Sequence, residues 1–243
     1  MVDIHCHILP EVDDGAWDLE TAVEMARMAE KCGVRKIIAT PHFDGVPRSL
    51  GELPYVLEQF ARLKKAIEGE KLKLELLPGV EVLCMPQTME LARQGRLPTL
   101  GDSRYVLAEF YFDAPRQFMD EMLGCMMHYG YKPVVAHPER YGAVQQEPEL
   151  IRDWFERGVV IQVNKGSVLG AFGRMAEEAA RYLLGRGLVH VIASDAHSPE
   201  RRTPDLEPVR RWAVDHLGRT YTQILLEDNP TRIAEGKPMR SHR

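Results

Sequence analysis

Short apolar runs rich in Val, Ile and Leu alternate along the chain with longer stretches whose apolar residues recur at helical spacing. This alternation is typical of repeated strand–helix units that build a parallel sheet. We count seven such units, whose predicted strands are Val2–His5, Val34–Ala39, Leu72–Leu77, Tyr105–Phe110, Pro133–Ala136, Val159–Val163 and Val189–Ser194. The pattern therefore predicts an α/β fold.

The first helix is predicted from both of its ends. Asp18 can cap its first turn, and Gly33 can end it in a left-handed turn. Between these two residues the apolar positions recur at helical spacing: Leu19, Ala22, Val23, Ala26 and Ala29. We therefore expect one face of this helix to pack against the sheet.

The length of 243 residues fits one large domain better than two small ones, because α/β barrels commonly reach this size around a single core. No Pro/Gly/Ser-rich linker, internal repeat or low-complexity tract divides the chain. Residues 1–243 are therefore expected to form a single domain. The stretch from Phe43 to Pro54 is the most irregular, and we predict a loop there that is a candidate cover for an active site.

Composition argues against several classes of protein. A net charge of −5 disfavours a general nucleic-acid binder, because such binding depends on Lys and Arg neutralising phosphates. No segment approaches the roughly 18 consecutive apolar residues of a membrane span, so an integral membrane protein is not expected. The sequence starts without the features of a signal peptide, and the four cysteines form no Cys-x-x-Cys pair. These observations favour the cytoplasm.

Side chains that commonly bind metals follow six of the predicted strands. Because the carboxyl ends of the strands share one rim in a parallel barrel, and active sites lie at that rim, we expect these side chains to meet. The segments are His5-Cys6-His7, Thr40-Pro41-His42, Gly79-Val80-Glu81, Glu109, His137 and Asp195-Ala196-His197.

Spacing within two of these segments favours a metal site. His5 and His7 are separated by one residue on an extended segment, so both imidazoles lie on the same side, as two ligands of one ion require. Asp195 and His197 repeat this spacing, and Asp13-Asp14 is close enough to His7 to reach the same rim. Alone, a His-x-His segment would equally be a pair of ordinary polar residues, but the agreement between the segments favours the metal site. The other histidines are expected to be structural or surface residues: His128, His190, His216 and His242.

Taken together, the motifs resemble those of the polymerase-and-histidinol-phosphatase (PHP) family. Within that family they are most similar to the bacterial manganese-dependent tyrosine phosphatases of capsule and exopolysaccharide operons. The resemblance covers essentially the whole chain and is specific because many motifs agree. They are Asp3–Pro10, Asp13–Gly15, Ala39–His42, Gly79–Glu81, Tyr105–Phe110, Ala136–Tyr141, Ser194–His197 and Asn229-Pro230.

The resemblance implies a distorted, TIM-barrel-like barrel of seven βα units that holds three divalent metal ions. Manganese is the implied metal, although mixed imidazole and carboxylate donors also suit iron or zinc. Nine ligands are implied in three sets, with Glu81 shared: His5, His7, Glu81 and Asp195; Glu81, Glu109 and His137; and Asp14, His42 and His197.

Two arginines match family positions that contact the substrate phosphate. Arg140 and Arg202 each carry a guanidinium that can fork onto phosphate oxygens, although either would otherwise be a surface salt bridge. The expected nucleophile is a metal-bound hydroxide, because metal ions lower the pKa of bound water toward neutrality.

A cysteine nucleophile is disfavoured. A tyrosine phosphatase of the thiol type needs a Cys followed six positions later by an Arg, and none of the four cysteines meets this spacing. Cys6 lies between His5 and His7, and strand alternation is expected to turn its thiol away from the imidazoles, so we predict a packing role rather than a metal ligand.

The resemblance therefore implies metal-dependent hydrolysis of phosphotyrosine in proteins. The implied substrate is the tyrosine-rich tail of a bacterial tyrosine kinase that governs polysaccharide export. Two alternatives are a phosphatase for a small monoester such as histidinol phosphate, and a catalytically silent PHP module that serves as a binding partner. The ligand set is compatible with the first alternative. It argues against the second, because a silent module would typically have lost ligands.

Overall fold

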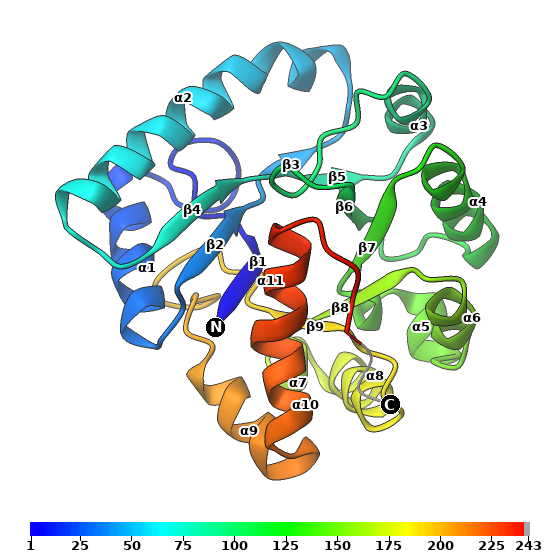
Figure 1. Cartoon of the computed structure of the whole chain (residues 1–243). Coiled ribbons are helices and arrows are strands. Elements are labelled where there is room, and N and C mark those ends of the chain that lie inside the picture. Colours follow the sequence, from blue (N-terminus) through cyan, green and yellow to red (C-terminus); the bar gives the residue numbers. More distant parts are fainter. Residues whose placement is uncertain (241–243) are drawn as a thin grey trace.

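The computed structural model describes residues 1–240, with the side chains of residues 47–52 left aside (Figure 1). Its strands are β1 (Val2–Cys6), β2 (Lys36–Ala39), β3 (His42–Phe43), β4 (Glu75–Pro78), β5 (Glu81–Leu83), β6 (Tyr105–Glu109), β7 (Lys132–Ala136), β8 (Val160–Asn164) and β9 (Val191–Ala193). All seven predicted strands are present, with ends within three residues of the prediction. Two additional short strands, β3 and β5, carry His42 and Glu81.

Helices follow most of the strands and surround them in Figure 1. They are α1 (Leu19–Lys31), α2 (Pro47–Gly69), α3 (Pro86–Arg93), α4 (Arg116–His128), η1 (Pro138–Arg140), α5 (Gly142–Gln146), α6 (Leu150–Glu156), α7 (Lys165–Val168), α8 (Arg174–Gly185), α9 (Glu207–Leu217), α10 (Arg219–Gln223), η2 (Ile224–Asp228) and α11 (Asn229–Ala234). This order confirms the predicted α/β class.

The strands are parallel and their pairings run around a ring. One sheet has the order β1-β2-β4, and the other has the order β3-β5-β6-β7-β8-β9. Because β3 follows β2 closely and β5 follows β4, two positions of the ring are each divided between the sheets. A parallel bridge between Cys6 and Ala196 joins β1 to the segment after β9. The ring therefore has seven strand positions, as expected for a distorted barrel.

Alternate residues of the strands form two apolar clusters. The inner cluster contains Ile4, Leu107 and Val134, whereas their neighbours along the strands, such as Val106 and Val135, pack in the outer cluster against the helices. This is the period-two pattern expected of a barrel whose interior is filled by side chains.

The helix α1 agrees with its prediction. The Asp18 carboxylate accepts a hydrogen bond from the Thr21 backbone N–H at 2.8 Å, and Gly33 has a φ of 93° just after the helix. The residues Ala22, Val23, Ala26 and Ala29 are buried. The predicted helix therefore begins, ends and packs as its sequence indicates.

The predicted loop from Phe43 to Pro54 is wrong over most of its length. The helix α2 begins at Pro47 and includes Pro54. Proline is compatible with the first turn of a helix, because the N–H that it lacks would have no partner there, so Pro47 starts the helix instead of excluding it. Only the segment from Phe43 to Val46 precedes the helix.

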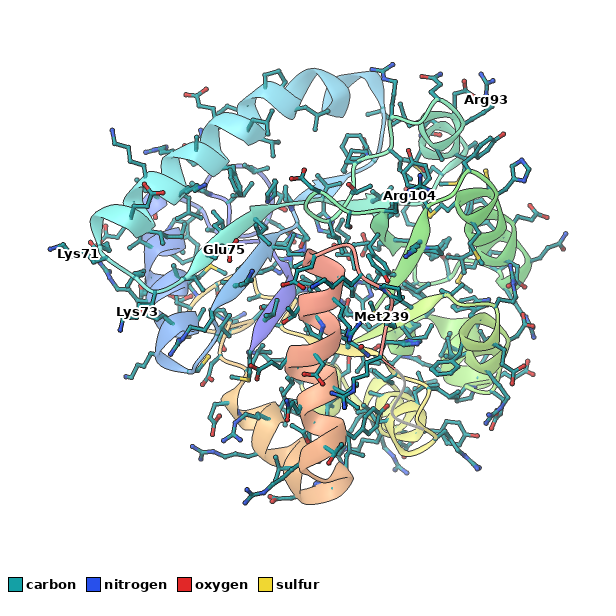
Figure 2. The ribbon with its side chains drawn as sticks, in the orientation of Figure 1. Lys71, Lys73, Glu75, Arg93, Arg104 and Met239 are labelled. Atoms are coloured by element: carbon teal, nitrogen blue, oxygen red, sulfur yellow. The ribbon has the colours of Figure 1, made fainter. Side chains whose placement is uncertain are left out.

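The amino ends of the strands are covered by the last part of the chain. In Figure 1, α11 lies across the centre of the ring, and Ile233 belongs to the inner cluster. Met239, seen beside α11 in Figure 2, packs against the same cluster. The Tyr105 hydroxyl, at the start of β6, donates a hydrogen bond to the Lys237 carbonyl at 2.8 Å. The predicted site lies at the opposite rim, at the carboxyl ends of the strands.

The length and hydropathy of the helices decide whether any of them could span a membrane. Among residues 1–240, no helix combines the length and the hydropathy needed to cross a bilayer.

Candidate metal centre

All nine predicted ligands converge at the carboxyl ends of the strands. Their side chains form four overlapping groups, and within each group the possible ligand atoms lie within 4.8 Å of one another. The groups are His5, His7 and Glu81; His5, His137 and Asp195; His42, Glu81 and Glu109; and His7, Asp14, His42 and His197. Residues that are up to about 190 positions apart in the sequence thus form one polar cluster.

The buried part of the cluster is organised around Glu81. Its Oε1 atom is 3.2 Å from His5 Nε2 and 3.1 Å from His137 Nε2. Its Oε2 atom is 3.2 Å from His7 Nε2 and 3.3 Å from His42 Nδ1. One carboxylate therefore contacts four imidazoles, a position that suits a ligand shared between ions.

Hydrogen bonds behind the imidazoles orient His5 and His7. His7 Nδ1 lies 2.7 Å from Asp13 Oδ2, and an ionised carboxylate can only accept, so Nδ1 carries the proton. His5 Nδ1 lies 2.9 Å from Gln162 Oε1 in the same way. In the neutral rings both Nε2 lone pairs then face the centre, where these two atoms are 3.3 Å apart. This arrangement is typical of histidines that bind metals.

A second buried group contains His137 and Asp195. Both residues have a positive φ, 35° for His137 and 50° for Asp195, in the left-handed region that residues with side chains seldom adopt. Asp195 Oδ2 accepts a hydrogen bond from Asn164 Nδ2 at 2.5 Å, and Asp195 Oδ1 lies 3.4 Å from His5 Nε2. Strained backbone conformations of this kind are common at functional sites. The surrounding structure has to compensate for their energetic cost.

The solvent side of the cluster contains Asp14, His42 and His197. Asp14 Oδ1 lies 3.4 Å from Nε2 of both His42 and His197. His42 and Asp14 are exposed, whereas His197 is buried. A ligand arriving from solvent would meet this group first.

The geometric groups overlap with the implied sets without repeating them. His5, His7 and Glu81 lie together, as do Asp14, His42 and His197. His137 instead groups with His5 and Asp195, although its Nε2 is also 3.6 Å from Glu109 Oε1. The assignment of particular ligands to particular ions stays a prediction.

The cluster attracts positive charge. Burial alone would lower the pKa of His5, but the charges of Glu81 and Asp195 raise it to about 9. Burial would raise the pKa of Asp195, but His5, His137 and Arg202 lower it to about 2. Protons and metal ions both supply the positive charge that the carboxylates stabilise. Metal binding here would therefore displace protons from the imidazoles. Mixed imidazole and carboxylate donors of this kind fit divalent transition metals.

The two predicted phosphate-binding arginines reach the same cluster. Arg202 Nη2 lies 2.5 Å and Arg140 Nη1 lies 3.5 Å from Asp195 Oδ2. Both guanidinium groups are partly exposed. They are therefore placed beside the candidate ligands and remain accessible to an anion.

The residues predicted to be structural lie outside the cluster. Cys6 is buried in the outer apolar cluster, which confirms its predicted packing role. His190 stacks on Phe155, and His216 stacks on Trp212. His128 contacts the ring of Tyr129, and His242 lies outside the described residues.

The sequence also matches a known family. The family model for capsular polysaccharide synthesis proteins, CpsB/CapC, matches residues 1–235. The chain belongs to the CpsB/CapC family.

Individual relatives agree with this membership. The chain is 38% identical over 203 residues to the tyrosine-protein phosphatase YwqE of Bacillus subtilis, covering 83% of this chain and 79% of YwqE. It is 30% identical over 240 residues to the tyrosine-protein phosphatase CpsB of Streptococcus pneumoniae, covering 96% and 98% of the two chains. A solved structure from work on YwqE and CpsB, described as metal-dependent tyrosine phosphatases, superposes with a TM-score of 0.88 at 33% identity, covering 99% of this chain and 96% of that chain.

Sequence reasoning missed the polar residues of β8 in this CpsB/CapC chain. Gln162 and Asn164 contact His5 and Asp195, and Gln162 Nε2 also donates to Asn164 Oδ1 at 2.8 Å. A signal was present, because these two polar residues alternate with apolar ones in the strand and therefore share its inner face. Neither side chain titrates, so a search for histidines and carboxylates passes over both.

We predict that Gln162→Leu weakens metal binding about 10- to 100-fold, because His5 loses the acceptor that orients its ring. The measurement is calorimetric titration of the metal-free protein with manganese. Gln117→Leu is the matched control, since Gln117 is exposed on α4 and its Nε2 contacts only Glu121 among the hydrogen bonds described. Equal metal affinity in the Gln162 variant and the control would show that this hydrogen bond does not orient a ligand.

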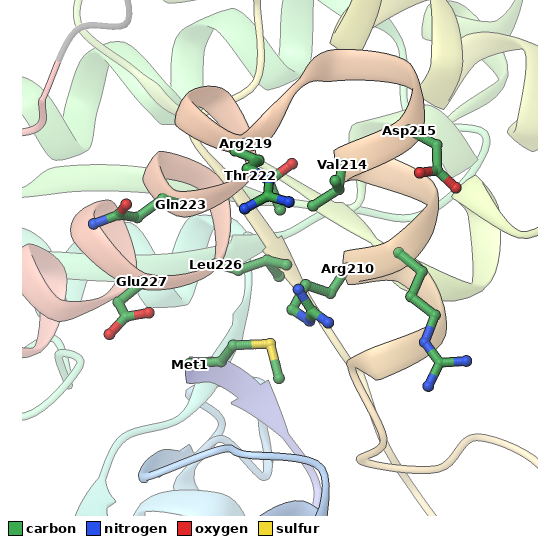
Figure 3. A pocket seen from close by; sticks show the side chains of 10 residues that line it. Met1, Arg210, Val214, Asp215, Arg219, Thr222, Gln223, Leu226 and Glu227 are labelled. Atoms are coloured by element: carbon green, nitrogen blue, oxygen red, sulfur yellow. The ribbon is translucent and has the colours of Figure 1, made fainter.

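A separate cavity lies away from the candidate metal centre. It has a volume of about 640 Å³, and its lining includes Met1, Arg210, Arg219 and Glu227 (Figure 3). None of the nine candidate ligands lines it. Met1 precedes β1, so the cavity lies toward the amino ends of the strands rather than at the rim with the candidate ligands.

Proposed function

We propose that this CpsB/CapC protein hydrolyses phosphotyrosine in proteins at a centre of three divalent metal ions, with manganese as the working metal. The proposed ligands are the nine residues of the cluster, and the proposed phosphate-binding residues are Arg140 and Arg202. The observation that carries the proposal is the orientation of His5 and His7, whose Nδ1 atoms face Gln162 and Asp13 and whose Nε2 atoms face Glu81. The names of the relatives YwqE and CpsB support the substrate class.

In such a centre, bound divalent ions would stabilise charge on the phosphoryl group and activate water for attack. The chain itself supplies binding and orientation. Arg140 and Arg202 can each donate two parallel hydrogen bonds to phosphate oxygens, which fixes the direction of the ester bond. In the structure both donate to Asp195, which holds their side chains at the rim before an anion arrives.

The proposed substrate is the tyrosine-rich tail of a bacterial tyrosine kinase that controls capsule or exopolysaccharide synthesis. The family name, capsular polysaccharide synthesis, supports this assignment. We place the reaction in the cytoplasm, since the four cysteines are free, as a reducing compartment would keep them. We also propose that the whole chain acts as one domain, because the ligands come from strands along nearly its full length.

The test is hydrolysis of a phosphotyrosine peptide by metal-stripped protein before and after the addition of manganese. We expect no turnover without metal and restored turnover with manganese, at a higher rate on phosphotyrosine than on a phosphoserine peptide or histidinol phosphate. Activity of protein that analysis shows to be free of metal would contradict the metal mechanism. A preference for histidinol phosphate would contradict the substrate assignment alone.

A further inference from the structure

The guanidinium of Arg140 lies between two phenyl rings. Its central carbon is 4.5 Å from the ring centroid of Phe112 and 4.6 Å from that of Phe172. Phe112 lies between β6 and α4, and Phe172 lies between α7 and α8, so two separate connections supply the rings. Stacking on aromatic faces restrains the plane of a guanidinium. Both rings therefore contact the Arg140 guanidinium.

Phe172 is the inner ring of this stack. It also faces Arg202, whose guanidinium carbon lies 5.6 Å from the ring centroid. The ring lies directly on Gly166, where a Cβ atom would come within 2.7 Å of it. The next residue, Gly173, has a φ of 89°, which residues with side chains rarely adopt. The absence of a side chain at Gly166 thus leaves room for the Phe172 ring beside both arginines.

Phe112 is the outer ring, and much of it remains in contact with solvent. It is 47% exposed, and its ring centroid lies 6.1 Å from that of His137. The ring therefore lies beside both a proposed metal ligand and a proposed phosphate-binding residue. The exposed face of the Phe112 ring can therefore contact the ester substituent of a phosphate bound at Arg140.

We propose that Phe112 determines specificity by contacting the aryl group of the substrate, an inference that rests on the proposed phosphatase function. A phosphate held between Arg140 and the metal centre brings its ester substituent beside Phe112. An aromatic substituent then buries apolar surface against the ring and gains ring–ring contact, whereas a short alkyl substituent gains much less. The site thereby recognises the tyrosine ring as well as the phosphate.

The test is direct calorimetric binding of phenylphosphonate and methylphosphonate to the manganese-loaded protein. Both compounds carry the same phosphonate group and neither has an ester to hydrolyse, so binding is measured apart from turnover. We expect Phe112→Leu to weaken phenylphosphonate about tenfold and to change methylphosphonate by less than about twofold, since ring–ring contacts are typically worth up to about a factor of ten. We expect Phe112→Tyr to keep the wild-type preference.

The neighbouring Tyr111 provides a matched control. It is 55% exposed on the same connection, but its hydroxyl contacts Met85 Sδ at 3.8 Å beside α3. Tyr111→Leu should leave both affinities within about twofold of the wild type.

Three results would overturn the inference: equal weakening of both phosphonates by Phe112→Leu, unchanged affinities in that variant, or a wild-type protein that does not prefer phenylphosphonate. The first would leave Phe112 as a positioning residue for Arg140. A wild-type protein that shows the expected binding but does not hydrolyse phosphotyrosine would instead contradict the proposed function and leave the aryl contact standing.

Discussion

Replacement of Glu81 by glutamine should lower kcat/KM for a phosphotyrosine peptide by on the order of 10³-fold. Bound metal ions supply several kcal/mol of transition-state stabilisation, and loss of a shared ligand would remove much of it. The glutamine side chain would keep the shape of the glutamate but lose its charge and one acceptor oxygen. Glu81 contacts His5, His7, His42 and His137, so the change affects the whole buried part of the cluster. The measurement is steady-state hydrolysis with manganese in excess, with circular dichroism to verify folding.

The control for this variant is Glu75→Gln. Glu75 begins β4 at the other end of the ring and forms an exposed ion pair with Lys36 at 2.8 Å. Exposed pairs of this kind contribute little, so its activity should stay within about twofold of the wild type. If the Glu81 variant kept more than about a tenth of the wild-type activity, Glu81 would not be a ligand of the catalytic centre.

Trp154→Ala should lower the free energy of unfolding by about 3–5 kcal/mol, the range measured for large aromatic side chains removed from protein cores. Trp154 is fully buried on α6, and its indole N–H donates to Asp120 Oδ1 at 2.6 Å. The substitution leaves both a cavity and a carboxylate without this donor. Urea unfolding followed by circular dichroism measures the loss.

Trp17→Ala is the companion variant, because the Trp17 side chain is 60% exposed. Its free energy of unfolding should change by no more than about 0.5 kcal/mol. A loss of less than about 1.5 kcal/mol at Trp154, or equal losses in the two variants, would mean that the packing around α6 differs from the structure described.

The strands could be predicted well because each is a short, strongly apolar run. The apolar run around Val106 to Ala108, for example, is buried on both faces of the sheet and needs no long-range information to be recognised. The start of α2 could not be predicted in this way. Its Gly51 and Pro54 are typical of loops, and the tertiary structure overrides that local preference.

The ligand-type residues of the centre could be predicted because they follow strands whose carboxyl ends must meet. Their supporting partners could not. Gln162 supports His5 only because β8 is placed so that its polar face points into the ring, and Phe172 reaches Arg140 only through the fold of the connection before α8. Such contacts depend on register and on loop conformation, which local sequence does not determine.

The junction between β1 and the segment after β9 suggests a mechanical role for the candidate metal centre in addition to its chemical one. The ring is joined there by one bridge between Cys6 and Ala196, a shorter ladder than those elsewhere, together with hydrogen bonds from the backbone of His7 and Asp195 and from Ser194. His5, His7 and Asp195 flank this junction from both sides. An ion held by these three residues would fasten the first and last strands of the ring to each other. Loss of the ion would then remove a cross-link at this short junction as well as the chemistry of the site.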